Sequence, residues 1–158
     1  MSPRADLVHE VLRHLRPLVL SSARVVEAGV RGVGWTVGSR AVVEVLREAG
    51  AATVPDIARR MDLPRQAVQR HVNDLATLGH VEQRTNPAHR RSVLIALTPD
   101  GAATFDRVRT RELRDLETLA AGCSTADLRT AAHVLAVLDR DVRARAAQVK
   151  SERSEEQR

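Results

Sequence analysis

Apolar residues near the start of the chain recur at intervals of three and four, as they do along one face of an amphipathic helix. This spacing predicts a helix over residues 5–28, which Pro17 should kink. Several glycines then interrupt the pattern, and a second helix is predicted over residues 38–48, with Gly50 at its end. The apolar positions of the first helix are Leu7, Val8, Val11, Leu12, Leu15, Leu18, Val19, Val25 and Val26.

Two short helices with a tight break between them are predicted next. Thr53 is followed at the third position by Asp56, which is the pattern of an N-cap with an acidic first turn. Pro64 suits the first turn of another helix, which extends to about Leu78 and stops at Gly79. The pair is typical of a helix-turn-helix, in which the first helix supports the second.

A β-hairpin with a basic tip is predicted after these helices. Residues 81–85 and 92–97 are short runs that contain β-branched side chains, and the segment between them reads Asn-Pro-Ala-His-Arg-Arg. A hairpin in this position relative to a helix-turn-helix is a wing. The elements therefore predict a winged helix-turn-helix.

Two further helices are predicted after the hairpin. Helix resumes at Thr98 and runs to about Ala121, and Ser124 with Asp127 caps a last helix. This last helix has apolar residues at heptad spacing, which is the seam that a partner helix needs. Residues 150–158 contain no apolar residue, and we predict that they are disordered. The heptad positions are Leu128, Ala131, Leu135, Leu138 and Val142.

The predicted helix that follows Pro64 has an apolar side and a polar side. Gln and Asn can pair bidentately with adenine, and Arg with guanine, in the major groove of DNA. A solvated surface helix carries the same residue types, so this face alone leaves both interpretations open. His71 falls on the apolar side, where we expect a core histidine with its hydrogen bonds satisfied. The candidate base-reading residues are Arg65, Gln66, Gln69, Arg70 and Asn73.

Charge supports an interaction with a polyanion. The formal net charge is +5, and all but one of the 25 basic residues are Arg. Coding composition would explain this excess of arginine equally well. The positions of the arginines along the chain are therefore more informative than their number. Residues 54–98 contain seven arginines and four acidic residues. Arg84, Arg90 and Arg91 lie on the predicted hairpin, where they can contact phosphates or the minor groove.

The central segment resembles the multiple-antibiotic-resistance regulator (MarR) family. The resemblance rests on Val54-Pro55-Asp56-Ile57-Ala58, on the helix from Arg65 to Leu75, on Gly79, and on Leu97-Thr98-Pro99-Asp100-Gly101. Members of this family are dimeric DNA-binding proteins, usually repressors, which a small anionic or phenolic ligand often releases. The wing of the family usually has Asp before its arginine pair, whereas this chain has His89, which cannot serve as that anion but can contact phosphate when protonated.

The resemblance implies a fold class and a division of the chain. We expect a mainly α protein with a small β-hairpin wing, in which a winged helix-turn-helix is flanked by dimerisation helices. Residues 5–37 would form the N-terminal dimerisation helix and loop, 38–98 the DNA-binding region, 99–149 the C-terminal dimerisation helices and 150–158 the tail. The wing contacts would be Arg84, His89, Arg90 and Arg91, and the DNA-backbone contacts Thr53 and Ser92.

These features predict a sequence-specific regulator that binds double-stranded DNA as a homodimer, reads a pseudo-palindromic operator and responds to a small-molecule effector. The alternatives are a nonspecific architectural DNA-binding protein and a protein-interaction module that retains the winged fold. Competition with random duplex separates the first alternative from a specific regulator. Failure to bind any duplex at low salt would favour the second.

Other chemistry finds little support in the sequence. The six histidines form no i, i+4 pair and none is close in sequence to Cys123, so we expect no metal ion and no cofactor. Cys123 is the only cysteine, which suits a reducing cytoplasm, and redox sensing by it is the less favoured alternative. We expect no membrane span, no phosphate-binding loop and no catalytic activity. Trp35 is expected to pack in the core.

Overall fold

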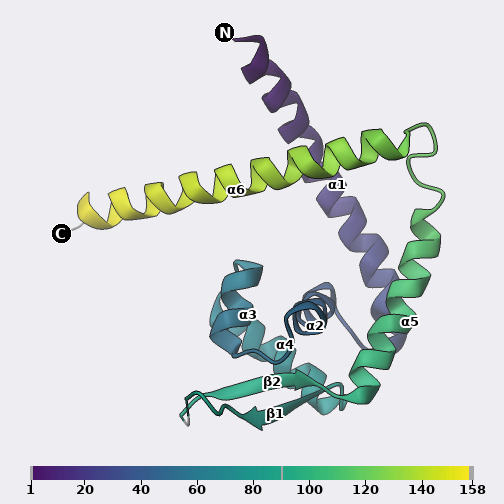
Figure 1. Ribbon diagram of the computed structural model, residues 1–158, viewed down its shortest axis with the longest axis vertical. Helices are drawn as coiled ribbons and strands as arrows, with labels where there is room; N and C mark the ends of the chain where they lie inside the picture. Colours follow the sequence, from purple (N-terminus) through teal and green to yellow (C-terminus); the bar gives the residue numbers. More distant parts are fainter. Residues whose placement is uncertain (1, 90, 157–158) are drawn as a thin grey trace. The chain divides into compact units, whose positions relative to one another are not determined.

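The computed structural model describes residues 2–89 and 91–156, which form two units, the first ending at Leu116 and the second beginning at Glu117. The first unit contains a winged helix-turn-helix with one long helix before it and one after it, and the second contains a single long helix (Figure 1). The predicted fold class is therefore confirmed. The elements are α1 (Pro3–Val30), η1 (Arg31–Val33), α2 (Val37–Ala49), α3 (Val54–Met61), α4 (Arg65–Thr77), β1 (Val81–Thr85), β2 (Val93–Leu97), α5 (Pro99–Leu116) and α6 (Thr125–Glu156).

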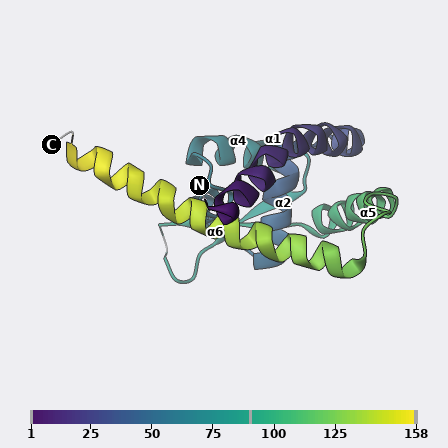
Figure 2. The ribbon, with the colours of Figure 1, turned by 90° about the horizontal axis from the view of Figure 1, so that it is seen from above.

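The core of the first unit lies where α2, α3 and α4 meet the hairpin. Helix α2 contacts α3, α4, α5 and β2, and in the view from above it lies between α4 and α5 (Figure 2). The core is aliphatic apart from Trp35 and Phe105, as the scarcity of aromatic residues requires. The largest fully buried side chains are Ile57, Leu75, Val30, Val42, Val43, Val68 and Thr104.

Local capping sets where the short helices begin. Thr36 and Ser39 form a reciprocal capping box, so α2 starts one residue earlier than predicted. The Thr53 hydroxyl accepts a hydrogen bond from the Asp56 amide at 3.3 Å and starts α3, which confirms the predicted N-cap. Asp62 then adopts a left-handed conformation with φ of 51°, and this residue ends α3 before the turn into α4.

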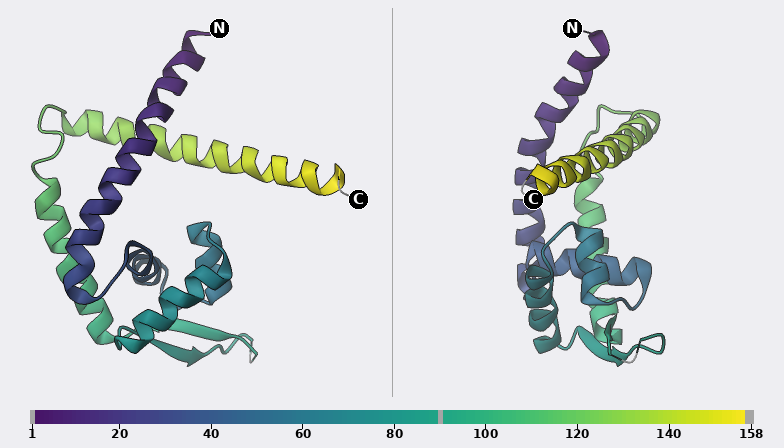
Figure 3. Two further views of the ribbon diagram at one scale, coloured as in Figure 1. Left: turned by 180° about the vertical axis from the view of Figure 1, so that it is seen from behind. Right: turned by 90° about the vertical axis from the view of Figure 1, so that its left-hand side faces the viewer.

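The wing is a regular antiparallel hairpin that projects from the edge of the first unit beyond α4 (Figure 3). Its register pairs Val81 with Leu97 and Thr85 with Val93. Ala52 adds an isolated bridge to Ile95, with N–O distances of 3.0 and 2.8 Å. This bridge attaches the segment before α3 to β2, so the wing and the helix-turn-helix share one framework.

Trp35 and His80 connect the start of α2 to the base of the wing. The Trp35 indole N–H donates to His80 Nδ1 at 2.9 Å, and both side chains are buried. The core position expected for Trp35 is therefore confirmed. On its other side His80 Nε2 lies 3.5 Å from an Asp100 carboxylate oxygen. Gly101 packs against the same site, where an added Cβ would lie 2.0 Å from the His80 carbonyl oxygen, so only glycine fits.

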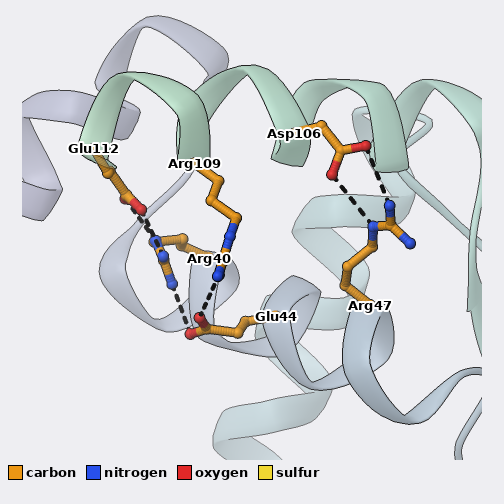
Figure 4. A network of polar contacts seen from close by, with 6 residues as sticks. All are labelled: Arg40, Glu44, Arg47, Asp106, Arg109 and Glu112. Atoms are coloured by element: carbon orange, nitrogen blue, oxygen red, sulfur yellow. Dashed lines mark hydrogen bonds and ion pairs between the residues drawn. The ribbon is translucent and has the colours of Figure 1, made fainter. Parts of the chain in front are cut away.

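An ion-pair network joins α2 to α5 (Figure 4). Arg40 binds Glu112 through two hydrogen bonds of 2.6 Å and Glu44 through one of 2.7 Å. Arg47 pairs with Asp106 at 3.3 Å further along the same two helices. Hydrogen bonding to Glu112 is the main cause that raises the pKa of Arg40 above its ordinary value, so the guanidinium stays charged throughout the accessible pH range.

The long helices differ from the prediction at their ends. Helix α5 ends at Leu116 instead of near Ala121, because Ala120 takes a left-handed conformation and Ser124 then caps α6. Helix α6 continues to Glu156, past residue 149, where we predicted that a disordered tail begins. The tail lacks apolar residues, but it also lacks Gly and Pro and contains Lys, Glu and Arg, which favour helix.

Large apolar side chains remain exposed on the terminal helices. On α1, Leu7, Leu18 and Val25 are 64%, 61% and 66% exposed. On α6, Leu135 and Val142 are 37% and 53% exposed. No helix within the described residues is sufficiently long and apolar to cross a membrane. Leu7, Leu18 and Val25 thus form an exposed apolar face of α1, and Leu135 and Val142 form one on α6.

Candidate nucleic-acid interface

Helix α4 has one buried side and one exposed side. Val68, Val72 and Leu75 are at most 2% exposed, and α4 packs through this side on α2 and α3. Leu78, at which we predicted that this helix ends, is 41% exposed because α4 ends before it. The five candidate base-reading residues are all exposed: Arg65, Gln66, Gln69, Arg70 and Asn73.

The outer face of α4 is partly ordered by its own hydrogen bonds. The Gln69 side-chain amide donates to Asn73 Oδ1 at 2.9 Å, one helical turn away. Arg65 and Arg70 have no ion-pair partner among the described residues, so their guanidinium charges are available to an external anion or base edge. The face thus combines an amide pair with two uncompensated cations.

His71 departs from the prediction. Its ring lies against Gly38 at the start of α2, where an added Cβ would be 2.2 Å from Nε2. Its Nδ1 is buried and has no hydrogen-bond partner among the described residues. The expectation of a fully satisfied core histidine is therefore wrong, because a helical projection gives the side that a residue faces and not the partner that it meets there.

The wing carries basic side chains in different environments. Arg84 pairs with Glu82 on the same strand at 2.6 Å, and this pair is solvent-exposed. His89 and Arg91 are exposed, and Arg91 has no ion-pair partner among the described residues. Arg90 lies outside the described residues. Of the predicted wing contacts, Arg91 therefore presents an uncompensated charge near the tip, whereas Arg84 does not.

Thr53 and Ser92, the candidate DNA-backbone contacts, use their hydroxyl groups internally. The Thr53 hydroxyl donates to Asp56 Oδ2 at 2.6 Å, and this bond is the main cause that lowers the pKa of Asp56. The Ser92 hydroxyl donates to the His89 carbonyl at 3.0 Å. Because a hydroxyl has one proton, a phosphate contact by either residue would have to replace these bonds.

Asn86 is a residue that we did not single out from the sequence. It is 7% exposed, although the residues on both sides of it are exposed. Its side chain bonds across the wing tip to Ser92 and to the Ala88 amide. The Asn-Pro pair at the start of the tip was the available signal, because Asn side chains readily bond to the backbone two residues on.

A metal site is not formed in the part of the chain that the structure describes, which contains no group of three or more His, Cys, Asp or Glu side chains suited to one. Cys123 is exposed in the turn before α6. The exposed side chains of α4 and of the wing therefore form a surface that carries basic and amide groups.

The fold and this surface define a winged helix-turn-helix protein, and comparison with known proteins gives the family. The MarR family model matches residues 39–92, from α2 to the wing tip. The crystal structure of a MarR family transcription regulator is 31% identical, covers 90% of this chain and 95% of its own, and superposes with a TM-score of 0.79. The chain belongs to the MarR family of transcription regulators.

Other relatives match in part or in fold. An uncharacterized protein of Mycobacterium tuberculosis is 44% identical over 63 residues, which are 40% of this chain and 44% of that protein. The chain thus aligns with less than half the length of this curated relative. A mutant MarR from E. coli, complexed with operator DNA, shares the fold with a TM-score of 0.71 at 21% identity, over 87% of this chain and 99% of that one.

Proposed function

We propose that this protein is a sequence-specific regulator that binds double-stranded DNA as a homodimer and acts as a ligand-responsive repressor on a pseudo-palindromic operator. The observation that carries the proposal is the two-sided α4, whose apolar side is fully buried while Gln66, Gln69 and Arg70 are exposed. A helix held in this way can enter the major groove, which is about 12 Å wide, without rearranging.

The exposed residues have complementary tasks in this proposal. Gln66, Gln69 and Asn73 would pair with adenine, and Arg70 with guanine, because these are the bidentate pairings that base edges allow. Arg91 on the wing would contact phosphate, since its charge is uncompensated among the described residues. Arg65 at the start of α4 would serve as a further contact. The helix would then supply sequence preference, and the wing would supply affinity.

The exposed apolar faces support the homodimer. On α6, Leu128, Leu135 and Val142 recur at seven-residue intervals and are 48%, 37% and 53% exposed. We assign residues 5–37 and 99–149 to dimerisation and 38–98 to DNA binding. A two-fold axis would place two α4 helices at half-sites about one turn of DNA apart, which makes the operator pseudo-palindromic.

The E. coli protein that shares this fold was crystallised with operator DNA, which favours DNA over a protein partner for the winged region. The repressor role and the small-molecule effector are proposed from membership of the family. A reporter gene placed behind the selected operator, with the protein present and absent, gives the sign of regulation.

The decisive experiment selects genomic DNA fragments with the purified dimer and then competes the best fragment against random duplex. We expect preference of at least about 1,000-fold for the selected site. Near-equal affinity for random duplex, with a steep salt dependence, would instead identify a nonspecific architectural protein. Arg70→Ala should lower affinity for the selected site by about 1 to 3 kcal/mol and relax preference at one base pair, whereas Arg91→Ala should weaken all sequences alike.

A further inference from the structure

The tip of the wing begins where main-chain pairing of the hairpin stops. Thr85 and Val93 are the last pair in the register, so Asn86 and Ser92 stand directly beyond it, opposite each other. Asn86 is 7% exposed, whereas Pro87, Ala88 and His89 after it are exposed. A buried amide at the end of an exposed hairpin indicates that this side chain has a structural task.

One hydrogen bond of Asn86 crosses the tip to Ser92, and three local bonds accompany it. Asn86 Nδ2 donates to Ser92 Oγ at 2.7 Å, and Ser92 Oγ donates in turn to the His89 carbonyl at 3.0 Å. The Ser92 amide donates to the same carbonyl at 2.9 Å. Asn86 Oδ1 accepts from the Ala88 amide at 3.0 Å. These four bonds, which we call the tip clamp, fix both ends of the turn that presents Arg91.

We propose that Asn86 and Ser92 are positioning residues of the wing, whose tip clamp holds the turn in its DNA-binding geometry before DNA arrives. The proposal rests on the proposed DNA-binding function. A turn that becomes ordered only on binding loses conformational freedom at that moment, which weakens the complex. Neither side chain needs to contact DNA for this effect, and the Ser92 hydroxyl proton is already donated to His89.

The first experiment tests the tip clamp in the DNA-free protein. Solvent exchange of the Ala88 and Ser92 amides is measured by NMR in the wild type and in Asn86→Ala, Ser92→Ala and Ser92→Thr. We expect the Ala88 amide to exchange roughly fivefold faster or more in Asn86→Ala, because it loses its acceptor. Ser92→Thr keeps the hydroxyl and should stay close to the wild type. Unchanged exchange in Asn86→Ala would overturn the proposal.

The second experiment tests the effect on DNA affinity. Asn86→Ala should weaken binding to the selected duplex by roughly five- to tenfold, which is the equivalent of about one net hydrogen bond. Gln83→Ala is the matched control, since Gln83 is exposed on the same hairpin but outside the tip clamp, and it should change affinity less than about twofold. Wild-type affinity in Asn86→Ala would overturn the positioning role.

A double-mutant cycle separates positioning from contact. If Asn86 acts by placing Arg91, then Asn86→Ala should add little in the Arg91→Ala background. Fully additive losses would show an independent contact by Asn86 and would overturn the proposal. A wild-type protein that binds no duplex would overturn the proposed function, and with it the role of the tip clamp in binding, whereas the exchange measurement would still report on the clamp itself.

Discussion

Large apolar side chains are buried in the winged region but exposed on the terminal helices. In the winged region Val42, Ile57 and Leu75 are completely buried within one chain. On the terminal helices Val25 and Val142 are 66% and 53% exposed. One chain therefore suffices to bury the core beneath the candidate DNA-binding surface, whereas α1 and α6 carry apolar faces that the proposed homodimer would cover. Recognition and assembly should therefore be separable by mutation.

Helix α5 belongs to both regions and changes character along its length. Phe105 and Val108 near its middle are buried in the core of the first unit. Leu113 and Leu116 near its end are 51% and 54% exposed. The Arg40–Glu112 pair lies at this transition and ties α2 to α5. A change in the position of α5 would therefore be transmitted to α2 through this pair, through the Arg47–Asp106 pair and through the packing of α5 on the core.

The largest expected effect comes from breaking assembly alone. Leu135→Glu combined with Val142→Glu places charges on the heptad face of α6 and should convert the proposed dimer to monomer at micromolar concentration. Affinity for the palindromic duplex should fall by about 100-fold or more, because the two half-sites are no longer bound together. Arg129→Glu, on another side of α6, is the control. Sedimentation and duplex binding are measured on each variant, and a dimer that survives the double change would contradict the assignment.

The next effect breaks the winged region alone. Leu75→Ala empties a fully buried position and should lower the free energy of unfolding by about 2 to 5 kcal/mol in urea denaturation. Leu78→Ala, on the same chain segment but at a position that is 41% exposed, should change it by less than about 1 kcal/mol. Equal losses in the two variants would mean that the core does not lie where the structure places it.

A smaller effect on stability is expected from breaking the Arg40–Glu112 pair, which connects α2 to α5. Glu112→Gln removes one charge from a pair whose side chains are 14% and 20% exposed, and should lower the free energy of unfolding by about 1 to 3 kcal/mol. Asp139→Asn breaks the Arg143–Asp139 pair on α6, which is 51% and 62% exposed, and should change it by about 0.5 kcal/mol or less. The free energy of unfolding of both variants is measured by chemical denaturation. A larger loss in Asp139→Asn than in Glu112→Gln would refute the prediction.

The smallest expected effect is a slight loss of helix at acidic pH, and it involves one carboxylate in each region. Hydrogen bonds from Thr53 and Ser124 hold the pKa values of Asp56 and Asp127 below the ordinary 3.8. The stabilisation that these carboxylates give is complete above that value and is lost as the pH falls through the lower folded-state pKa. Far-UV circular dichroism should show a slight loss of helix there, and Asp56→Asn and Asp127→Asn should each remove part of this pH dependence.

Local patterns predicted most of the winged region. Thr53 and Asp56 predicted the cap of α3, and the alternation of apolar and polar positions gave the buried side of α4. These features depend on residues close in sequence, which is why a linear pattern reveals them. The boundary of α5 was predicted less well, because Ala120 gives no sequence signal for the left-handed conformation that it adopts.

The sequence predicted which residue types form the candidate site, but it did not predict the hydrogen bonds that these residues make. Exposure of Gln69 and Asn73 follows from helical periodicity, but their mutual hydrogen bond depends on rotamers. The ring of His71 lies against Gly38, which is more than thirty residues away in sequence, and its Nδ1 has no hydrogen-bond partner among the described residues. Asn86 likewise bonds to Ser92 across the turn. Contacts of this kind need the folded chain.

The hydrogen bond between Trp35 and His80 gives the protein an optical reporter of its own. Trp35 is the only tryptophan, and its indole is 4% exposed at the junction of α2, the wing and α5. Emission from this single fluorophore comes from one known place, so no label is needed to follow that junction. A titration with DNA or with an effector that displaces the imidazole from the indole should register directly as a change in intensity and wavelength.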